Sequence, residues 1–262
     1  MTNFSKDPLN SRIKQNYELR QRHYLTRRTP VIVRLDGKSF SKYTAPLKDR
    51  FHQGFIEVMN LTAIKLAKEI QGVQFAYIQS DEISLLLHDY KTLQSEAWFD
   101  YCQNKVESIS AAIASATFTM ESWRIWTTQS RVEPRPYYSL LYDDIKPAYF
   151  DSRSFNVPES EVCNAFLARQ RDAIKNSINS LGQSIYSHKE LQGKNCGEIQ
   201  EMCFQKEHNW NDLPTYMKRG RCIVKTSYEV NGTTRTKWVV DNEIPEFSQN
   251  RNYVNQYLAT DE

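Results

Sequence analysis

The apolar positions in the first part of the chain follow two periods, one typical of strands and one typical of helices. Short apolar runs that predict strands occupy 30–35, 73–78, 83–87 and 147–157. Apolar residues recur at helical spacing over 52–70 and 98–118. The order of elements is therefore β-α-β-β-α-β, which predicts an α+β fold built on a ferredoxin-like unit.

The C-terminal third has a different pattern. Residues 160–181 have the spacing of a basic amphipathic helix, and 221–241 predict a β-hairpin that turns at Asn231-Gly232. Trp238 in this hairpin is expected in the core rather than as a stacking platform for bases.

These patterns suggest two domains. The first, residues 1–158, is expected to be the ferredoxin-like unit with an N-terminal extension. The second, residues 159–262, is expected to be a helical, basic extension with the β-hairpin, packed on the first. Nothing in the segment after Ile244 predicts a role.

Acidic residues stand at the ends of three strand-like runs. Asp36 ends VIVRLD, and Asp81 with Glu82 lies between the two runs of the expected 73–87 hairpin. Carboxylates placed against buried strands need a partner that offsets their charge, and in nucleotide chemistry that partner is commonly Mg²⁺. In a split β-α-β-β-α-β sheet the first strand neighbours the hairpin, so Asp36 and Asp81 can hold one metal together. Taken alone, either acid is more often the cap of a turn, so the pair carries the argument.

The loop after Asp36 has features suited to phosphate. Gly37 lets the backbone approach a ligand closely, Lys38 adds a positive charge and Ser39 adds a hydroxyl. The string DGKSFSKY is not a Walker motif, because it lacks the spaced glycines and the terminal Gly-Lys-Ser/Thr. Together with QSDE around Asp81, it favours a nucleotide-handling enzyme.

Charge and cysteine content bear on the binding partner and on the cellular compartment. The net charge is only +3, but basic residues gather near Arg20–Arg28, Arg169–Lys175 and Lys218–Lys225, which suits a phosphate backbone as well as a solvated surface. Five cysteines without a CxxC pair favour a reducing compartment, and no apolar stretch reaches membrane-spanning length. We therefore expect a cytoplasmic protein without a membrane partner. A weak alternative is a zinc site of unusual spacing, made of His188, Cys196, Cys203 and His208.

Five blocks in matching order resemble the tRNA-His guanylyltransferase family: RLDGKSFSKY, AYIQSDEISLLL, the helix bearing Asn104-Lys105, FDSRSFN and ARQRDAIKNSIN. SIYSHKELQGKN and NWNDLPTYMKRG are similar to its bacterial and phage guanylyltransferase-like branch. The resemblance implies a polymerase-like palm that adds nucleotides in the 3′-to-5′ direction to the 5′ end of an RNA. It also implies two Mg²⁺ ions, ATP to adenylylate a 5′-monophosphate, and GTP or another NTP whose 3′-hydroxyl attacks. tRNA as partner and a homo-oligomer, a tetramer, are implied as well.

The resemblance makes residues 1–158 a palm-like catalytic domain and assigns roles to residues within it. It implies metal ligands at Asp36, at Asp81 and at the Gly37 carbonyl, with Glu82 as a supporting catalytic carboxylate. The implied nucleotide-binding residues beyond the metal ligands are Lys38, Ser39, Phe40, Ser41, Ser80 and Lys105. Lys48 and Asp49 depart from the family's Lys-Pro-x-Asp string, which leaves their roles open.

RNA contacts are expected farther along the chain. The expectation rests on the basic patches and, for Lys194, on the resemblance. The residues are Arg169, Arg171, Lys175, Lys194, Lys218 and Arg219.

One departure bears on the choice of RNA. Enzymes dedicated to tRNA-His carry a histidine shortly after an Arg-Gln pair, whereas here Ile174 stands at that place after Arg169-Gln170. The departure favours repair of 5′-truncated tRNA by copying the opposite strand over selection by the anticodon. Three alternatives stay open: a dedicated tRNA-His guanylyltransferase, a palm-type nucleotidyl cyclase, and a non-enzymatic RNA-binding protein with structural acids.

Overall fold

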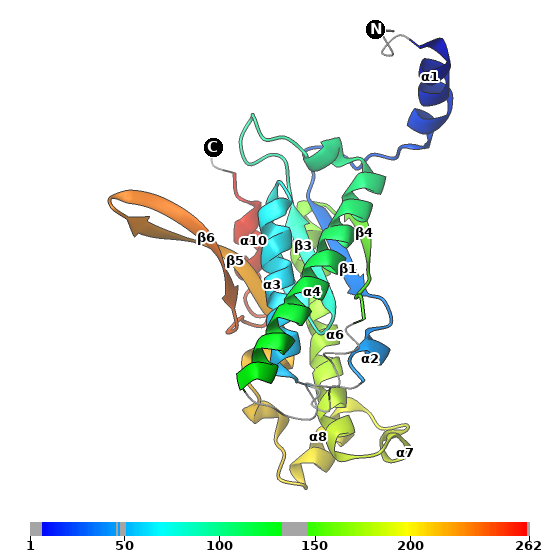
Figure 1. Ribbon diagram of the computed structural model, residues 1–262. Helices are drawn as coiled ribbons and strands as arrows, with labels where there is room; N and C mark the ends of the chain where they lie inside the picture. Colours follow the sequence, from blue (N-terminus) through cyan, green and yellow to red (C-terminus); the bar gives the residue numbers. More distant parts are fainter. Residues whose placement is uncertain (1–6, 46, 48–50, 133–145, 261–262) are drawn as a thin grey trace.

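A computed structural model describes residues 7–45, 47, 51–132 and 146–260 of the chain. Its centre is one sheet with the strand order β4-β1-β3-β2-β5-β6, in which all neighbours are antiparallel (Figure 1). The strands are β1 (Val31–Gly37), β2 (Val73–Gln79), β3 (Glu82–Leu87), β4 (Phe150–Asn156), β5 (Arg221–Val230) and β6 (Thr233–Asp241).

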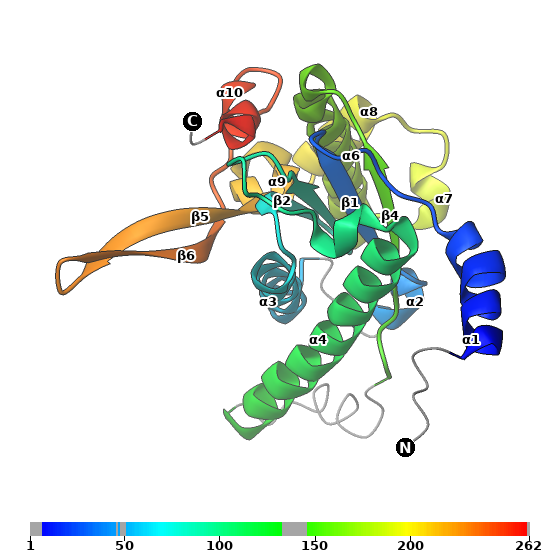
Figure 2. The same cartoon turned by 90° about the horizontal axis from the view of Figure 1, so that it is seen from above.

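Helices cover both faces of this sheet (Figure 2). The long helices α3 (Gln53–Glu69) and α4 (Gln103–Val132) lie on one face, and α6 (Glu159–Ile185) lies on the other. The order β4-β1-β3-β2 with α3 and α4 as connections is the ferredoxin-like arrangement, so the predicted fold class is confirmed. The short elements are α1 (Pro8–Ile13), η2 (Lys14–Glu18), η3 (Leu19–Gln21), α2 (Phe40–Tyr43), η4 (Trp98–Tyr101), α7 (His188–Leu191), α8 (Cys196–Phe204), η5 (Trp210–Asp212), α9 (Thr215–Arg219), α10 (Asn252–Asn255) and η6 (Gln256–Leu258).

The alternation of side chains along β1 divides the core in two. Val33 and Leu35 are fully buried in the cluster beneath α3 and α4, whereas Ile32 belongs to the cluster on the α6 side. By the same alternation Arg34 and Asp36 point toward the α6 side of the sheet. Both faces of β1 are thus occupied, which explains why its sequence is nearly continuously apolar until Asp36.

The C-terminal hairpin extends the palm sheet. β5 pairs with β2, with Arg221 opposite Ile78, and the distal part of the hairpin projects from the body (Figures 1 and 2). Asn231 and Gly232 both have positive φ, as the two-residue turn predicted from their sequence requires. Trp238 packs half-buried against the core beneath α3, as predicted. The division into domains 1–158 and 159–262 stays a prediction.

The segment after Ile244, for which the sequence predicted nothing, completes the second core. Ile244, Phe247 and Val254 are buried against β2 and α6. Phe75 of β2 stacks on Tyr257 at a ring distance of 5.0 Å. The tail therefore takes the place of a second helix on this face of the sheet.

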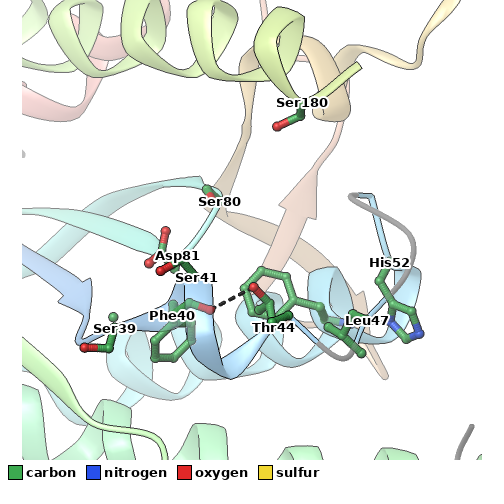
Figure 3. Close-up of a pocket in the computed structure, with 12 residues that line it drawn as sticks. Ser39, Phe40, Ser41, Thr44, Leu47, His52, Ser80, Asp81 and Ser180 are labelled. Carbon is green, nitrogen blue, oxygen red and sulfur yellow. Dashed lines mark hydrogen bonds between the residues drawn. The ribbon is translucent and has the colours of Figure 1, made fainter. Parts of the chain in front are cut away.

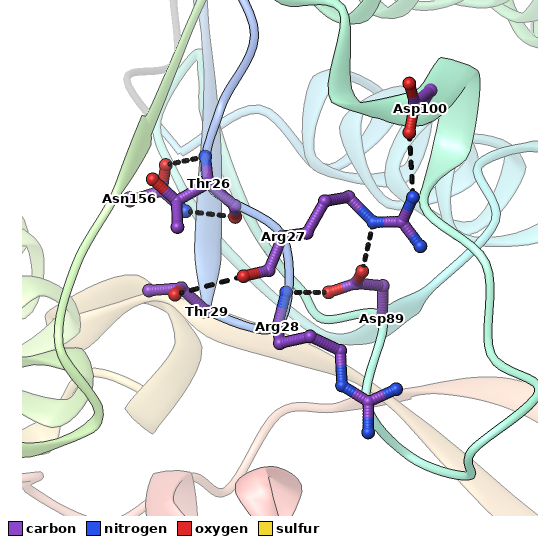
Figure 4. Close-up of polar contacts among 7 residues, drawn as sticks. All are labelled: Thr26, Arg27, Arg28, Thr29, Asp89, Asp100 and Asn156. Atoms are coloured by element: carbon purple, nitrogen blue, oxygen red, sulfur yellow. Dashed lines mark hydrogen bonds and ion pairs between the residues drawn. The ribbon is translucent and has the colours of Figure 1, made fainter.

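The chain before β1 is fastened to the strand ends farthest from Asp36 (Figure 4). Asn156 at the end of β4 exchanges two hydrogen bonds with the Thr26 backbone, of 2.8 and 3.0 Å. Asp89, which follows β3, accepts a hydrogen bond of 2.5 Å from the Arg27 Nε and one of 2.8 Å from the Arg28 N–H. Arg27 also donates to Asp100.

A small third cluster lies between the end of α6 and α8, with Ile178, Leu181 and Cys203 buried in it. Within the described ranges no group of three His, Cys, Asp or Glu side chains is placed to hold a metal ion, so the zinc alternative is wrong there. No helix of the described chain has both the length and the apolar character needed to cross a membrane.

Candidate active site

Strand pairing brings the two predicted metal carboxylates to one edge of the sheet. Asp36, the sixth residue of β1, lies opposite Glu82 of β3, and the Gly37 N–H donates to the Asp81 carbonyl at 3.2 Å. Ser80 and Asp81 form the tight turn between β2 and β3, and Ser80 has φ 48°. Residues 45 positions apart in sequence thus become neighbours because β1 and the β2–β3 hairpin share a ladder.

The acids are not neutralised by the protein. The pKa of Asp36 is raised, first by burial and then by repulsion from Asp81, Glu82 and Asp151. The pKa of Asp81 is raised by burial, which outweighs its hydrogen bond with Ser80. No ion pair joins either carboxylate to a described residue. Two half-buried carboxylates that disfavour their own charge, beside a backbone carbonyl at Gly37, form a donor set that fits Mg²⁺.

Glu82 has a different environment from its two neighbours. Arg169 of α6 donates to both of its carboxylate oxygens, Nε to Oε1 at 2.7 Å and Nη2 to Oε2 at 2.6 Å. Arg169 also donates to Asp172 at 2.6 Å. This fork fastens α6 to the start of β3, next to Asp81. The guanidinium predicted to bind RNA is therefore engaged within the protein.

Gly37 is required by the close approach of Phe40. A Cβ at position 37 would lie 2.3 Å from the Phe40 ring, which is buried against Phe118 and Phe150 at ring distances of 5.1 and 5.0 Å. Ser39, with φ 57°, begins the single turn of α2. The ring of Phe40 thus holds the loop after Asp36 down on the core while its serines stay at the surface.

A cavity of about 650 Å³ opens beside these residues (Figure 3). Asp81 and Ser80 come from the hairpin turn, Ser41 comes from α2, and Ser180 reaches in from α6. The lining residues are Gly37, Ser39, Phe40, Ser41, Thr44, Ala45, Leu47, His52, Phe55, Ser80, Asp81 and Ser180. Six of these were predicted from the sequence. Hydroxyl groups dominate the polar lining, which suits phosphate or ribose oxygens.

Comparison with known proteins shows which family the chain belongs to. The sequence profile described as tRNAHis guanylyltransferase matches residues 10–158, more than half of the chain. The chain belongs to the tRNA-His guanylyltransferase family. It is accordingly a nucleotidyltransferase of tRNA processing, as the resemblance implied.

Individual relatives agree with this family. A bacterial tRNA(His) guanylyltransferase-like protein, solved in complex with ATP, is 37% identical with a TM-score of 0.82, over 96% of this chain and 99% of that one. A bacterial structure of the same description in complex with GTP is 36% identical over the same shares, with a TM-score of 0.79. A probable tRNA(His) guanylyltransferase of Dictyostelium discoideum is 26% identical over 87% of this chain and 89% of its own length.

Two lysines predicted to bind nucleotide lie outside the cavity. Lys38 is exposed, and its N–H donates to the Tyr149 carbonyl at 2.8 Å. The Lys105 ammonium lies over the Phe99 ring at 5.4 Å. Ser115 of α4 accepts from the Phe150 N–H, next to Gly37, whereas Glu107, two residues after Lys105, accepts from the Ser154 N–H farther along β4. Lys105 therefore lies toward the opposite end of the sheet. Their roles stay predictions, and Lys48 and Asp49 lie outside the described residues.

The basic residues expected to contact RNA fall into two groups. Arg171 and Lys175 are exposed on α6. The others contact the protein itself: Arg169 with Glu82, Lys194 with Glu198 at 3.9 Å, Lys218 with the Asn211 carbonyl at 2.6 Å, and Arg219 with Glu246 at 3.2 Å. Ion pairs of exposed side chains are weak, so an RNA phosphate can compete for them more easily than for the buried Arg169–Glu82 fork.

Sequence reasoning missed His52 and Ser180. His52 caps α3, where its Nδ1 accepts from the Phe55 N–H at 3.3 Å. A capping position before a periodic helix was a usable signal for it. Ser180 carries no local signal, because only the packing of α6 across the hairpin turn brings it to the cavity.

Proposed function

We propose that this enzyme adds nucleotides in the 3′-to-5′ direction to the 5′ end of RNA, directed by the opposite strand, and that 5′-truncated tRNA is its substrate. Family membership and the bacterial relatives with bound ATP and GTP support a nucleotide-dependent reaction on tRNA. The observation that carries the proposal is the pair Asp36 and Asp81, which form no ion pair with a described residue: Asp81 lines a cavity rich in hydroxyl groups, and Asp36 is its neighbour across the strand ladder.

In this proposal Asp36, Asp81 and the Gly37 carbonyl hold two Mg²⁺ ions. Bound there, the ions would activate the attacking 3′-hydroxyl and neutralise the leaving pyrophosphate. Glu82, tied to Arg169, fixes the hairpin turn that presents Asp81. The side chains that line the cavity position the nucleotide, and in-line alignment supplies much of the rate.

The nucleotide-binding part of the proposal rests on α2 and the hairpin turn. Ser39, Ser41 and Ser80 line the cavity beside Asp81, and in this proposal their hydroxyl or backbone N–H groups donate to triphosphate oxygens. ATP activates the RNA 5′-monophosphate by adenylylation, and GTP or another NTP then attacks. Lys38 and Lys105 bind nucleotide only if the loop or the substrate extends beyond the cavity.

Substrate choice is proposed to depend on base pairing rather than on the anticodon. Ile174, at the place where dedicated enzymes carry a histidine, packs against the apolar cluster between α6 and α8. The side chain of Ile174 has no hydrogen-bonding atoms, so it cannot replace that histidine as a polar contact. RNA is held by Arg171 and Lys175, together with Lys194, Lys218 and Arg219 once their surface contacts are exchanged. The family resemblance leads us to propose a homo-oligomer, a tetramer.

The test measures Mg²⁺-dependent transfer of labelled nucleotide onto 5′-truncated tRNAs. One set of tRNAs differs only in the anticodon and a second set only in the templating base. We expect addition to follow the templating base with all four NTPs and to be indifferent to the anticodon. Dependence on the anticodon with indifference to the template would establish a dedicated tRNA-His enzyme instead. Absence of transfer would leave the cyclase or the RNA-binding alternative.

A further inference from the structure

A buried arginine stands beside the candidate active site without an acidic partner. Arg221, the first residue of β5, is 3% exposed. Its Nε donates to Asn60 and its Nη2 donates to the Ile56 carbonyl at 3.2 Å, both on α3. No carboxylate among the described residues pairs with it, and burial lowers its pKa to about 10. A buried cation without a counter-ion is unfavourable, so its retention calls for a reason.

The backbone fixes the direction of this side chain. Gly220, with φ 81°, precedes it, and a Cβ there would lie 2.5 Å from the Ile78 carbonyl and 2.6 Å from the Tyr77 hydroxyl. That hydroxyl donates to the Arg219 carbonyl at 2.7 Å. The start of β5 is therefore clamped against β2, and the hydrogen bonds to Asn60 and to the Ile56 carbonyl hold the guanidinium at the other end of the side chain.

Arg221 forms one wall of a recess of about 100 Å³ between α3, α6 and the segment before β5. Asn176, Ser80 and Ser180 supply polar groups, and the recess shares Phe55, Ser80 and Ser180 with the larger cavity. No acidic residue is among the described residues that line it. Ser177 is already committed, since its hydroxyl lies within hydrogen-bond distance of the Ile174 and Lys218 carbonyls, to which its single proton can be donated, and accepts from the Trp210 Nε1.

The two adjoining spaces have opposite electrostatic character. The larger cavity is lined by Asp81 and by no Lys or Arg among its described residues, whereas the recess is lined by Arg221. A guanidinium has five N–H donors, and the described residues accept from only two of them. The remaining donors form a fork that matches two oxygens of a phosphate group.

We propose that this recess binds a phosphate group of a substrate, with the Arg221 guanidinium as its principal donor and Asn176 and Ser180 as additional donors. The phosphate comes either from the 5′ end of the RNA or from the polyphosphate of a nucleotide. The inference deepens the proposed function, because it places an anion subsite directly beside the carboxylate pair. The phosphate supplies the counter-charge that Arg221 lacks.

Binding in EDTA tests the subsite without the metal. The probes are a short RNA hairpin with a 5′-monophosphate, the same hairpin with a 5′-hydroxyl, and tripolyphosphate. We expect the wild type to bind the 5′-phosphorylated RNA hairpin about tenfold more tightly than the 5′-hydroxyl form, or tripolyphosphate about tenfold more tightly than sulfate, or both. Arg221→Met, which keeps the apolar volume, should lose that preference, and Arg221→Lys should retain part of it. Arg251→Met removes an exposed arginine that donates to Asn164 and serves as the charge-matched control.

The outcomes identify the source of the phosphate and show which of the two proposals has failed. Preference for the phosphorylated hairpin alone assigns the phosphate to RNA, and binding of tripolyphosphate alone assigns it to the nucleotide. Unchanged preference in Arg221→Met, or no phosphate preference in the wild type, overturns the proposal and leaves Arg221 a structural residue. If Arg221→Met does not fold, Met217→Trp fills the rim of the recess with Arg221 intact and should cause the same loss. Asp36→Asn should keep the preference while losing nucleotide addition, so the two proposals fail independently.

Discussion

The two ends of the central sheet treat their acidic residues in opposite ways. At the end where β1 begins, Asp89 is 1% exposed and both of its oxygens accept hydrogen bonds, from the Arg27 Nε and from the Arg28 N–H (Figure 4). At the end where β1 finishes, Asp36 and Asp81 are half-buried beside each other, and no described cation pairs with either.

This difference separates a structural acid from a functional one. A buried carboxylate that only supports the fold is expected to have its charge and its hydrogen bonds satisfied by the protein, as Asp89 has. A pair whose pKa values are raised by burial and by neighbouring carboxylates lowers the stability of the free protein. Such a pair is retained where a ligand completes it. Burial alone would not have distinguished the two ends, because acids at both ends are withdrawn from water.

The largest effect is expected from neutralising either carboxylate of the candidate active site. Asp36→Asn and Asp81→Asn should each reduce nucleotide addition by about three orders of magnitude or more. Because folding raises both pKa values, ionisation of the pair removes stability as the pH rises from about 4. The melting temperature of either variant in EDTA at pH 7 should therefore equal or exceed that of the wild type. Near wild-type addition at saturating Mg²⁺ would contradict the two-metal proposal.

A smaller effect is expected from two arginines two positions apart on α6. Arg169→Gln leaves Glu82 buried without its partner and should lower the free energy of unfolding by about 3 kcal/mol, with loss of activity as Asp81 is displaced. Arg171→Gln should leave stability unchanged and reduce the slope of log K for RNA against log salt by about one unit. Denaturant unfolding and salt-dependent RNA binding measure the two effects. A reduced salt slope in Arg169→Gln, with full stability, would show that the fork opens to bind RNA.

The sequence predicted the palm well because its signals are local. Apolar runs and helical periods located β1 to β4 with α3 and α4, and Asn231-Gly232 located the β5–β6 turn. The acid pair followed from topology, since any β-α-β-β-α-β order places the first strand beside the hairpin. Asp36 itself lies inside β1 rather than after it, and that difference changes only the predicted boundary.

What the sequence did not predict depends on packing between distant elements. Arg169 looked like its neighbours Arg171 and Lys175, and only the crossing of α6 over β3 shows that it faces Glu82. Arg221 belonged to a basic cluster with Lys218 and Arg219, yet it alone is buried. The tail after Ile244 has no periodicity, because its apolar residues fill gaps on a surface that other elements create.

The smallest effect is expected at the structural end. Asp89→Asn keeps an acceptor for the Arg28 N–H but removes the charge that pairs with Arg27, whose side chain is 44% exposed and can be hydrated. The free energy of unfolding should fall by about 1–2 kcal/mol. The matched control Asp100→Asn removes an acid that is 70% exposed and pairs with the same arginine, and it should change stability by less than about 0.5 kcal/mol.

Nucleotide addition by Asp89→Asn, measured per folded molecule below the melting transition, should match the wild type. The reason is that Asp89 lies at the end of β3 opposite to Glu82, with the whole of the strand between them. A stability loss of equal size in Asp89→Asn and Asp100→Asn would show that burial adds nothing to the Arg27 contact. Loss of addition with retained stability would show that the two ends of the sheet are coupled, and the distinction between structural and functional acids would then fail.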